Sequence, residues 1–202
     1  FRCPYCMPAA EFTEDYRFLS RSERLSHDEI FRVASIAVGL GVTKLRITGG
    51  EPLLDKNAVS LVSRLAALPC LDDLALTTNG VLLAPMAQSL ADAGLHRVTI
   101  SLDSIDETVF TQMSGGRGDL GKVFAGIEAA ERSGLSPIKI NVVVQRGVND
   151  NGVLDVLERF RGTGHIVRLI EFMDVGSRNG WSLDQVVPSK EILKRIQAKW
   201  PL

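Results

Sequence analysis

The chain has 202 residues, a length that fits one domain with room for a small additional segment. Hydrophobic residues make up 45% and charged residues 23%, which is the composition of a protein with a packed core and excludes a disordered chain. The 23 Lys+Arg and 24 Asp+Glu leave a formal net charge of −1, so we expect no general nucleic-acid-binding or acidic-membrane surface.

Membrane insertion and a disulfide scaffold are also excluded. No apolar run reaches the roughly 18 residues that a membrane span requires, and three cysteines are too few for a disulfide-built domain. We therefore expect a reducing, cytoplasmic location. Because the sequence opens at Phe1 without an initiator Met, we expect a fragment, and a targeting segment upstream of Phe1 stays open.

The predicted helices carry apolar residues at helical spacing. Ser26 and Glu29 match a capping box, and the helix that they open has Ile30, Val33, Ala34 and Ala37 on the face that we expect to pack inward. Further helical patterns follow at 83–90, 153–160 and 189–196. Ser189 is the expected N-cap of the last one.

Five strand candidates alternate with helix-length segments, at residues 44–48, 73–79, 97–103, 138–144 and 167–172. This alternation predicts an α/β protein with a parallel sheet and right-handed crossovers. Two architectures remain, an open doubly wound sheet and a curled partial barrel.

The side chains of the strands alternate between apolar and polar, which favours the barrel. A parallel strand covered by helices on both faces is apolar on both faces. The apolar positions here are Leu45, Ile47, Leu74, Leu76, Val98, Ile100, Leu102, Ile138, Ile140, Val142 and Val144. The polar positions are Arg46, Thr48, Thr77, Thr99, Ser101, Lys139, Asn141 and Arg168. Since buried cations without a partner are costly, the polar face is expected to line a wet cavity or to hold an anionic, phosphate-bearing ligand. The alternative is the solvated face of an open sheet.

Polar clusters follow several strands, where a β/α barrel has its active site. Asp103 and Ser104 belong to one such cluster, and they are alternatively expected to cap the next helix. Residues 116–122 carry the glycines and lysine of a P-loop. Val123 replaces the required Ser or Thr and no strand pattern precedes the segment, so a glycine loop is preferred.

Cys3-Pro4-Tyr5-Cys6 is a Cys-x-x-Cys pair. By itself such a pair is compatible with zinc, iron–sulfur or thiol–disulfide chemistry. A four-ligand zinc site is disfavoured because Cys70 and the three histidines are scattered without ligand spacing. Disulfide exchange is disfavoured because no helical pattern follows the pair directly.

The cysteine pair, with its aromatic residue before the second cysteine, and Gly49-Gly50-Glu51-Pro52 after a strand resemble the radical S-adenosylmethionine (SAM) superfamily. Further motifs, in order and spacing, resemble the GTP 3′,8-cyclases of that superfamily, which act first in molybdenum-cofactor synthesis. These motifs are Thr77-Thr78-Asn79-Gly80, Ser101-Leu102-Asp103-Ser104, Ile138-Lys139-Ile140-Asn141, Gly147-Val148-Asn149-Asp150 and Glu171-Phe172-Met173-Asp174-Val175-Gly176.

The resemblance implies a partial (β/α)6 TIM-like barrel of the radical SAM type, with the first strand and the C-terminal part missing. Residues 1–180 would form the radical SAM core, and residues 181–202 would begin a truncated C-terminal region.

The resemblance also implies the cofactors and the residues that bind them. A [4Fe–4S] cluster is held by three cysteines, of which Cys3 and Cys6 match two and the first would precede Phe1; a second [4Fe–4S] cluster belongs to the missing C-terminal part. The residues that match SAM binding are Tyr5, Gly49, Gly50, Glu51, Ser101, Asn141 and Met173. The residues that match GTP binding are Arg46, Thr77, Lys139 and Arg168. No residue is assigned as a catalytic acid or base.

The implied reaction is reductive cleavage of SAM to a 5′-deoxyadenosyl radical, which takes a hydrogen atom from C3′ of GTP and leads to C3′–C8 cyclisation. The implied partners are GTP, a reducing electron donor and the next enzyme of molybdopterin synthesis, with no nucleic acid and no membrane; a homodimer is left open. The fragment alone is expected to be inactive. Two alternatives remain, another radical SAM enzyme that modifies a peptide or cofactor, and a noncatalytic nucleotide-binding module with a structural cysteine pair.

Overall fold

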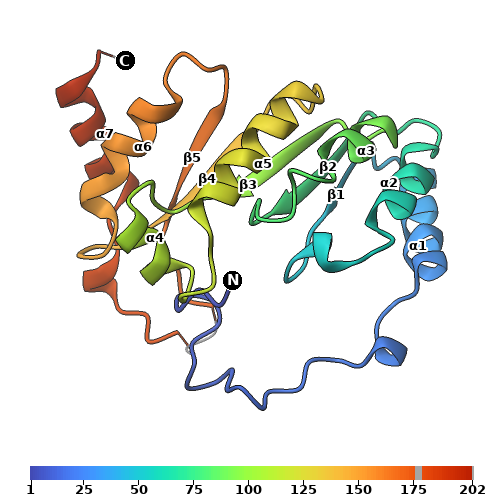
Figure 1. The fold of residues 1–202 in the computed structure, drawn as a ribbon, viewed down its shortest axis with the longest axis horizontal. Coiled ribbons are helices and arrows are strands. Elements are labelled where there is room, and N and C mark those ends of the chain that lie inside the picture. The colour runs from blue at the N-terminus through green and yellow to red at the C-terminus, as the bar shows by residue number, and fades with distance from the viewer. Residues whose placement is uncertain (176–178, 202) are drawn as a thin grey trace. The chain divides into compact units, whose positions relative to one another are not determined.

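The computed structural model describes residues 1–175 and 179–201 (Figure 1). Gly176, the last residue of the motif that begins at Glu171, lies outside the described residues. Within the described part of the chain, no helix has the length and apolar character needed to cross a membrane.

Strands and helices alternate along the chain, as the sequence pattern predicts (Figure 1). The strands are β1 (Lys44–Ile47), β2 (Asp73–Thr78), β3 (Arg97–Ser101), β4 (Lys139–Val144) and β5 (Ile166–Glu171). The α-helices of the described residues are α1 (His27–Gly39), α2 (Ala58–Ala66), α3 (Ala87–Asp92), α4 (Glu107–Met113), α5 (Leu120–Arg132), α6 (Val153–Phe160) and α7 (Ser189–Lys199). All five strand predictions are confirmed, with small differences at their ends. Helix α3 begins later than the pattern at 83–90 suggested, because Met86 N bonds to Leu83 O in a preceding turn.

The strand order is β1-β2-β3-β4-β5, the same as the order along the chain. The registers of β1 with β2, β2 with β3 and β4 with β5 are parallel. A doubly wound sheet reverses its direction of growth within the strand order, whereas a β/α barrel adds each strand beside the previous one. The observed order therefore confirms the barrel type and excludes the doubly wound alternative.

The chain divides into two compact units. Unit 1 contains Phe1–Asp15, Ser101–Leu120 and the chain from Lys139 onward; unit 2 contains Tyr16–Ile100 and Gly121–Ile138. Strands β4 and β5 with helices α4, α6 and α7 thus belong to unit 1. Strands β1 and β2, most of β3, and helices α1, α2, α3 and α5 belong to unit 2.

The core of unit 2 is built from the predicted apolar positions of its strands. Leu74, Leu76, Val98 and Ile100 are completely buried, and Leu76 lies beside Val98 in the β2–β3 register. Burying a side chain of this size contributes about 1.5–3 kcal/mol. The opposite parity of the same strands carries the polar residues, so the predicted separation into two faces is confirmed.

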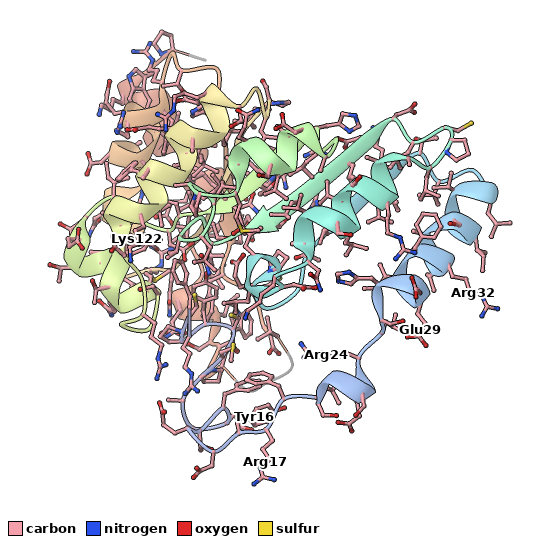
Figure 2. All side chains as sticks on the ribbon, turned by 45° about the vertical axis from the view of Figure 1, so that its right-hand side comes forward. Tyr16, Arg17, Arg24, Glu29, Arg32 and Lys122 are labelled. Atoms are coloured by element: carbon pink, nitrogen blue, oxygen red, sulfur yellow. The ribbon has the colours of Figure 1, made fainter. Side chains whose placement is uncertain are left out.

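Helix α1 opens with the predicted capping box. Ser26 Oγ accepts a hydrogen bond from Glu29 N at 3.2 Å, and the Glu29 carboxylate accepts one from Ser26 N at 2.7 Å. Glu29 and Arg32 are exposed (Figure 2). On the predicted inward face Ala34 is buried, but Val33 is 58% exposed, so the expectation for Val33 is wrong. Consecutive residues point about 100° apart on a helix, and in α1 the buried side is narrow enough to include Ala34 and not Val33.

In unit 1 the alternation of β4 is equally regular. Ile140, Val142 and Val144 are completely buried. Helix α6, which contacts the neighbouring strand β5, buries Val153, Val156 and Phe160. The opposite face of β4 carries Lys139 and Asn141, which are half-buried.

Two expectations about helix starts are wrong. Pro188, and not Ser189, is the N-cap of α7; the main-chain N and the Oγ of Ser189 both donate to Glu171 Oε1, so a carboxylate from β5 satisfies the first turn. Helix α4 is capped by Asp106, whose Oδ1 accepts a hydrogen bond from Val109 N at 2.9 Å. Asp103 is thereby free for another role.

The glycine and lysine pattern at 116–122 does not form a P-loop. It leads into α5, and the element before it is the helix α4, where a P-loop requires a strand. The preferred interpretation, a glycine loop before a helix, is confirmed.

Candidate functional site

Cys3 and Cys6 are brought together by a tight turn in unit 1. Cys6 N and Met7 N both donate to Cys3 O, at 3.0 and 2.8 Å. The Cys3 thiol is buried and the Cys6 thiol is exposed. A hydrogen bond from the Cys3 thiol lowers the pKa of Cys6 to about 7, while the same bond and burial raise the pKa of Cys3. One thiolate is therefore readily formed near neutral pH, and the thiolate is the form that binds metals.

The pair does not complete a metal site by itself. In residues 1–175 and 179–201, no group of three or more His, Cys, Asp or Glu side chains is arranged to hold a metal ion. Any metal at Cys3 and Cys6 thus needs further ligands, either from outside the described residues or from a bound molecule.

Tyr5, inside the cysteine turn, is anchored at both ends in unit 1. Its hydroxyl donates to Asp103 Oδ2 at 2.8 Å, and its carbonyl oxygen accepts a hydrogen bond from Asn179 Nδ2 at 2.9 Å. The same Asn179 nitrogen lies 3.1 Å from the carbonyl oxygen of Met173. Asn179 therefore brings together two of the residues that the resemblance assigns to SAM, Tyr5 and Met173.

Burial changes the protonation of this pair. Burial of the Asp103 carboxyl raises its pKa to about 6, although hydrogen bonds from Val143 N and the Tyr5 hydroxyl oppose the rise. Burial is also the main cause that raises the pKa of Tyr5, with the nearby Asp103 charge adding to it. Tyr5 thus stays protonated and acts as the donor.

The polar face of β4 and β5 lies in the same unit. Asn141 and Arg168 are direct partners in the β4–β5 register, so their side chains emerge side by side. Asn141 Oδ1 is buried and accepts no hydrogen bond within the described chain. Arg168 is half-buried and has no carboxylate partner among the described residues. A buried acceptor and a cation, both unsatisfied, are what a polar or anionic ligand would complete.

Unit 2 shows the same pattern on β2 and β3. Thr77 and Thr99 are register partners, and both hydroxyls are buried without a hydrogen-bond partner in the part of the chain described. At the amino ends of the same strands, Arg97 Nε donates to Asp73 Oδ1 at 2.9 Å, while Arg97 Nη1 is buried without a hydrogen-bond partner among the described residues. Unsatisfied polar groups therefore occur along this face, and the hydroxyls of Thr77 and Thr99 are two of them.

Arg46 extends this face onto β1. It lies opposite Ala75 in the β1–β2 register, which places it on the same side of the strands as Thr77. Its side chain is exposed and forms no ion pair with any described carboxylate. Arg46 thus adds an exposed cation to the face that carries Thr77 and Thr99.

Glu51 holds the glycine loop of unit 2 to the carboxyl end of β2. Its Oε1 accepts hydrogen bonds from Leu53 N at 3.1 Å and Thr78 Oγ1 at 2.7 Å, and its Oε2 accepts one from Asn79 N at 2.8 Å. The carboxylate is directed into the protein. Its contacts are those of a residue that orients the loop.

Gly49 and Gly50 are exposed, and packing does not demand glycine at either position. A Cβ added to either residue would meet no atom within 4 Å. Glycine here leaves the backbone accessible to a ligand.

The structure divides the predicted site residues between the units. Unit 1 contains Cys3, Tyr5, Cys6, Ser101, Lys139, Asn141, Arg168 and Met173. Unit 2 contains Arg46, Gly49, Gly50, Glu51 and Thr77. None of them lines the cavity of about 650 Å³ between α2 and α3 or the one of about 490 Å³ beside α6 and α7.

Sequence reasoning missed two residues of this site. Asn179 belongs to none of the motifs of the sequence, so no local signal distinguished it. Asp103 stood within a motif, but its local position suggested a helix cap. Only the contact with Tyr5, which lies 98 residues away, reveals what its carboxylate does.

The model of the radical SAM superfamily matches residues 1–160. The chain belongs to the radical SAM superfamily. It is 55% identical over 202 residues to the GTP 3′,8-cyclase of Xanthomonas campestris pv. campestris (strain B100), covering 100% of this chain and 59% of that relative. It is 50% identical over 201 residues to the GTP 3′,8-cyclase of Acidothermus cellulolyticus (strain ATCC 43068 / DSM 8971 / 11B), covering 100% of this chain and 56% of that relative.

This radical SAM chain spans less than two thirds of the length of those curated relatives. Among solved structures it resembles Streptococcus suis SuiB bound to S-adenosylmethionine, with a TM-score of 0.72 and 14% sequence identity over 98% of this chain and 45% of that one. At that identity the likeness shows the fold alone, and it agrees with the barrel-type strand order.

Proposed function

We propose that the whole protein to which this radical SAM chain belongs is a GTP 3′,8-cyclase. The observation that carries the proposal is the unsatisfied polar face of the strands in each unit: among the described residues, Arg168 of unit 1 and Arg46 of unit 2 have no carboxylate partner, and the Thr77 hydroxyl of unit 2 is buried without a hydrogen-bond partner. Such a face calls for an anionic ligand with hydrogen-bonding groups. The relatives named GTP 3′,8-cyclase, which match the entire chain, supply the candidate, GTP.

Cys3 and Cys6 would supply two of the ligands of a [4Fe–4S] cluster. The turn that joins them and the low pKa of Cys6 support this role. When bound, the cluster and SAM would supply the radical that removes hydrogen from C3′ of GTP and leads to the C3′–C8 bond. No protein acid or base is assigned.

Residues of both units would bind SAM. In unit 1 the proposed residues are Tyr5, Ser101, Asn141 and Met173. In unit 2, Gly49 and Gly50 would offer main-chain groups to SAM, and Glu51 would act by holding their loop. The unpartnered Oδ1 of Asn141 and the open space beside both glycines support these roles.

Each unit carries residues that we propose for GTP binding. They are Lys139 and Arg168 in unit 1 and Arg46 in unit 2, and these cations suit phosphate oxygens through charge-assisted hydrogen bonds. Thr77 would donate its hydroxyl proton to the nucleotide, which would satisfy an atom that is otherwise buried without a partner.

The remaining expectations concern the rest of the protein. Residues 1–180 would be the radical SAM core and residues 181–202 the start of a C-terminal region that holds a second [4Fe–4S] cluster. A reducing electron donor would deliver the electron, and the next enzyme of molybdopterin synthesis would receive the product. A homodimer stays a prediction.

The decisive experiment uses the full-length protein, reconstituted anaerobically with iron and sulfide. Chromatography with mass detection quantifies 5′-deoxyadenosine and a cyclised nucleotide with and without GTP. Formation of both products only with GTP is the expected result. Deoxyadenosine without the nucleotide would point to a radical SAM enzyme with another substrate, and neither product from a loaded cluster would favour a noncatalytic nucleotide-binding module.

A further inference from the structure

Asp103 is a buried carboxylate that joins separate segments of unit 1. It follows the end of β3, and its residue surface is 8% exposed. Oδ1 accepts a hydrogen bond from Val143 N, and Oδ2 accepts one from the Tyr5 hydroxyl, both at 2.8 Å. One side chain therefore links strand β4 to the turn that carries Cys3 and Cys6.

The backbone beside Asp103 is held on both sides. Leu102 N donates to Asn141 O at 2.9 Å, so the chain that leaves β3 continues along β4. Asn149 Nδ2, which is buried, donates to Asp103 O at 2.8 Å and to Val143 O at 2.7 Å. A rotation of Asp103 away from this place would leave buried main-chain groups without partners, which is unfavourable. The direction of the carboxylate is thus determined by the sheet.

A carboxylate is an unexpected residue at this position if packing is its only role. Removing a charged group from water is costly unless a cation or several donors compensate it. No cation forms an ion pair with Asp103 within the described residues. The cost of burying the Asp103 carboxylate is compensated by two hydrogen-bond donors, Val143 N and the Tyr5 hydroxyl. Of these two donors, only the Tyr5 hydroxyl belongs to the cysteine turn.

We propose that Asp103 is a positioning residue for the iron–sulfur site: its carboxylate holds the Tyr5 ring, and through it the Cys3–Cys6 turn, in the arrangement that accepts a [4Fe–4S] cluster and SAM. This inference rests on the proposed function, because it takes Cys3 and Cys6 as cluster ligands. Asp103 acts through Tyr5 and is not itself a ligand of the cluster.

The test uses the full-length protein with Tyr5→Phe, Asp103→Asn and both together. Tyr5→Phe removes only the hydroxyl; Asp103→Asn keeps an oxygen for Val143 N but presents an amide nitrogen to Tyr5. Asp106→Asn is the matched control, because Asp106 caps α4 in the same segment and does not contact the turn. After anaerobic reconstitution, electron paramagnetic resonance of the reduced cluster is followed during a titration with SAM.

Each single variant is expected to bind SAM roughly tenfold more weakly than the parent does, because each loses one hydrogen bond to a charged group. The double variant should be no weaker than the weaker single variant, because both substitutions act on the same hydrogen bond: Tyr5→Phe removes it and Asp103→Asn removes its charge. Asp106→Asn should keep the spectrum and the SAM titration of the parent, because Asn caps a helix about as well as Asp does. Parent-like titrations of Tyr5→Phe and Asp103→Asn, or fully additive losses, would overturn the proposal. If Asp103→Asn does not fold, Tyr5→Phe alone decides, and a parent-like titration then rejects the role.

Cys6→Ala separates a failure of this inference from a failure of the proposed function. If Cys6→Ala retains the iron content of the parent, Cys6 is not a cluster ligand and the proposed function fails with it. If Cys6→Ala loses one cluster while Asp103→Asn and Tyr5→Phe behave like the parent, only the positioning role is rejected. A Cys70→Ala variant, at an exposed cysteine of unit 2, is expected to keep its iron in either case.

Discussion

Glu51 Oε1 accepts a hydrogen bond from Thr78 Oγ1 at 2.7 Å, which links the glycine loop to the end of β2. Thr78 is 2% exposed, and Glu51 also receives the N–H groups of Leu53 and Asn79. The carboxylate thus replaces main-chain acceptors at a point where the strand has ended. The conformation of Gly49 and Gly50 therefore depends on an interaction that neither glycine makes.

Glu51→Gln is predicted to destabilise unit 2 and to weaken SAM binding together. The amide can accept at one atom only, so one of the donors of Thr78 and Asn79 loses its partner. Loss of such a bond costs about 1–3 kcal/mol, measured as the free energy of unfolding in urea. Glu128→Gln, at an exposed helix position, is the control and should change stability by less than about 0.5 kcal/mol. Equal stability of Glu51→Gln and the parent would contradict the role of this carboxylate.

Gly115→Ala is predicted to loosen the cysteine turn of unit 1. Gly115 has a φ of +69°, and a Cβ there would lie 2.0 Å from Arg2 O, so the backbone that precedes Cys3 would have to move. Gly116→Ala is a close control, because Gly116 has a similar φ of +72° but open space around its Cβ position. Hydrogen exchange at Arg2 N, which donates to Ser114 O, should become faster in Gly115→Ala and change little in Gly116→Ala. Equal exchange rates at Arg2 N in the two variants would contradict the prediction, because they would show that the positive φ, and not the contact with Arg2 O, causes the change.

The Glu191 carboxylate is predicted to stabilise unit 1 in a pH-dependent way. Hydrogen bonds from Arg146 and Arg195 lower the pKa of Glu191 to about 2 from an ordinary 4.5. A lowered pKa means that the folded state favours the charged form, so the stabilisation is complete above pH 4.5 and is lost as the pH falls toward 2. The urea midpoints of the parent and Glu191→Gln should therefore differ at pH 7 and converge as the pH falls through that interval. A difference that is independent of pH would contradict the ionic origin.

Lys139→Ala is predicted to weaken GTP binding and to leave cluster assembly intact. Lys139 is half-buried on the polar face of β4. It lies two residues before Asn141, on the same face, and its positive charge suits a phosphate. A loss of roughly tenfold or more in GTP affinity is expected from removal of one charge-assisted contact, measured by calorimetry on the reconstituted full-length protein. Lys194→Ala, at an exposed position of α7, should bind GTP like the parent. Unchanged affinity in Lys139→Ala would remove this residue from the GTP site.

Much of the fold could be predicted because its signals are local. The alternation of Ile138, Ile140, Val142 and Val144 with polar residues defines both the strand and its two faces, and the structure buries all four apolar residues. The capping box at Ser26 marks the start of α1 in the same way. The wrong expectations, such as Ser189 as an N-cap, arose where a distant carboxylate, Glu171, replaced the local partner.

The sequence by itself determined the strands and their polar face, the cysteine pair and the motifs of the superfamily, because these depend on residue type at short, regular spacing. Only the tertiary structure decided which polar groups are satisfied. Thr77 and Thr99 become neighbours through strand register, and Tyr5 meets Asp103 across 98 residues. Hydrogen bonds between distant segments follow from how the strands and loops pack, and no local pattern encodes that packing.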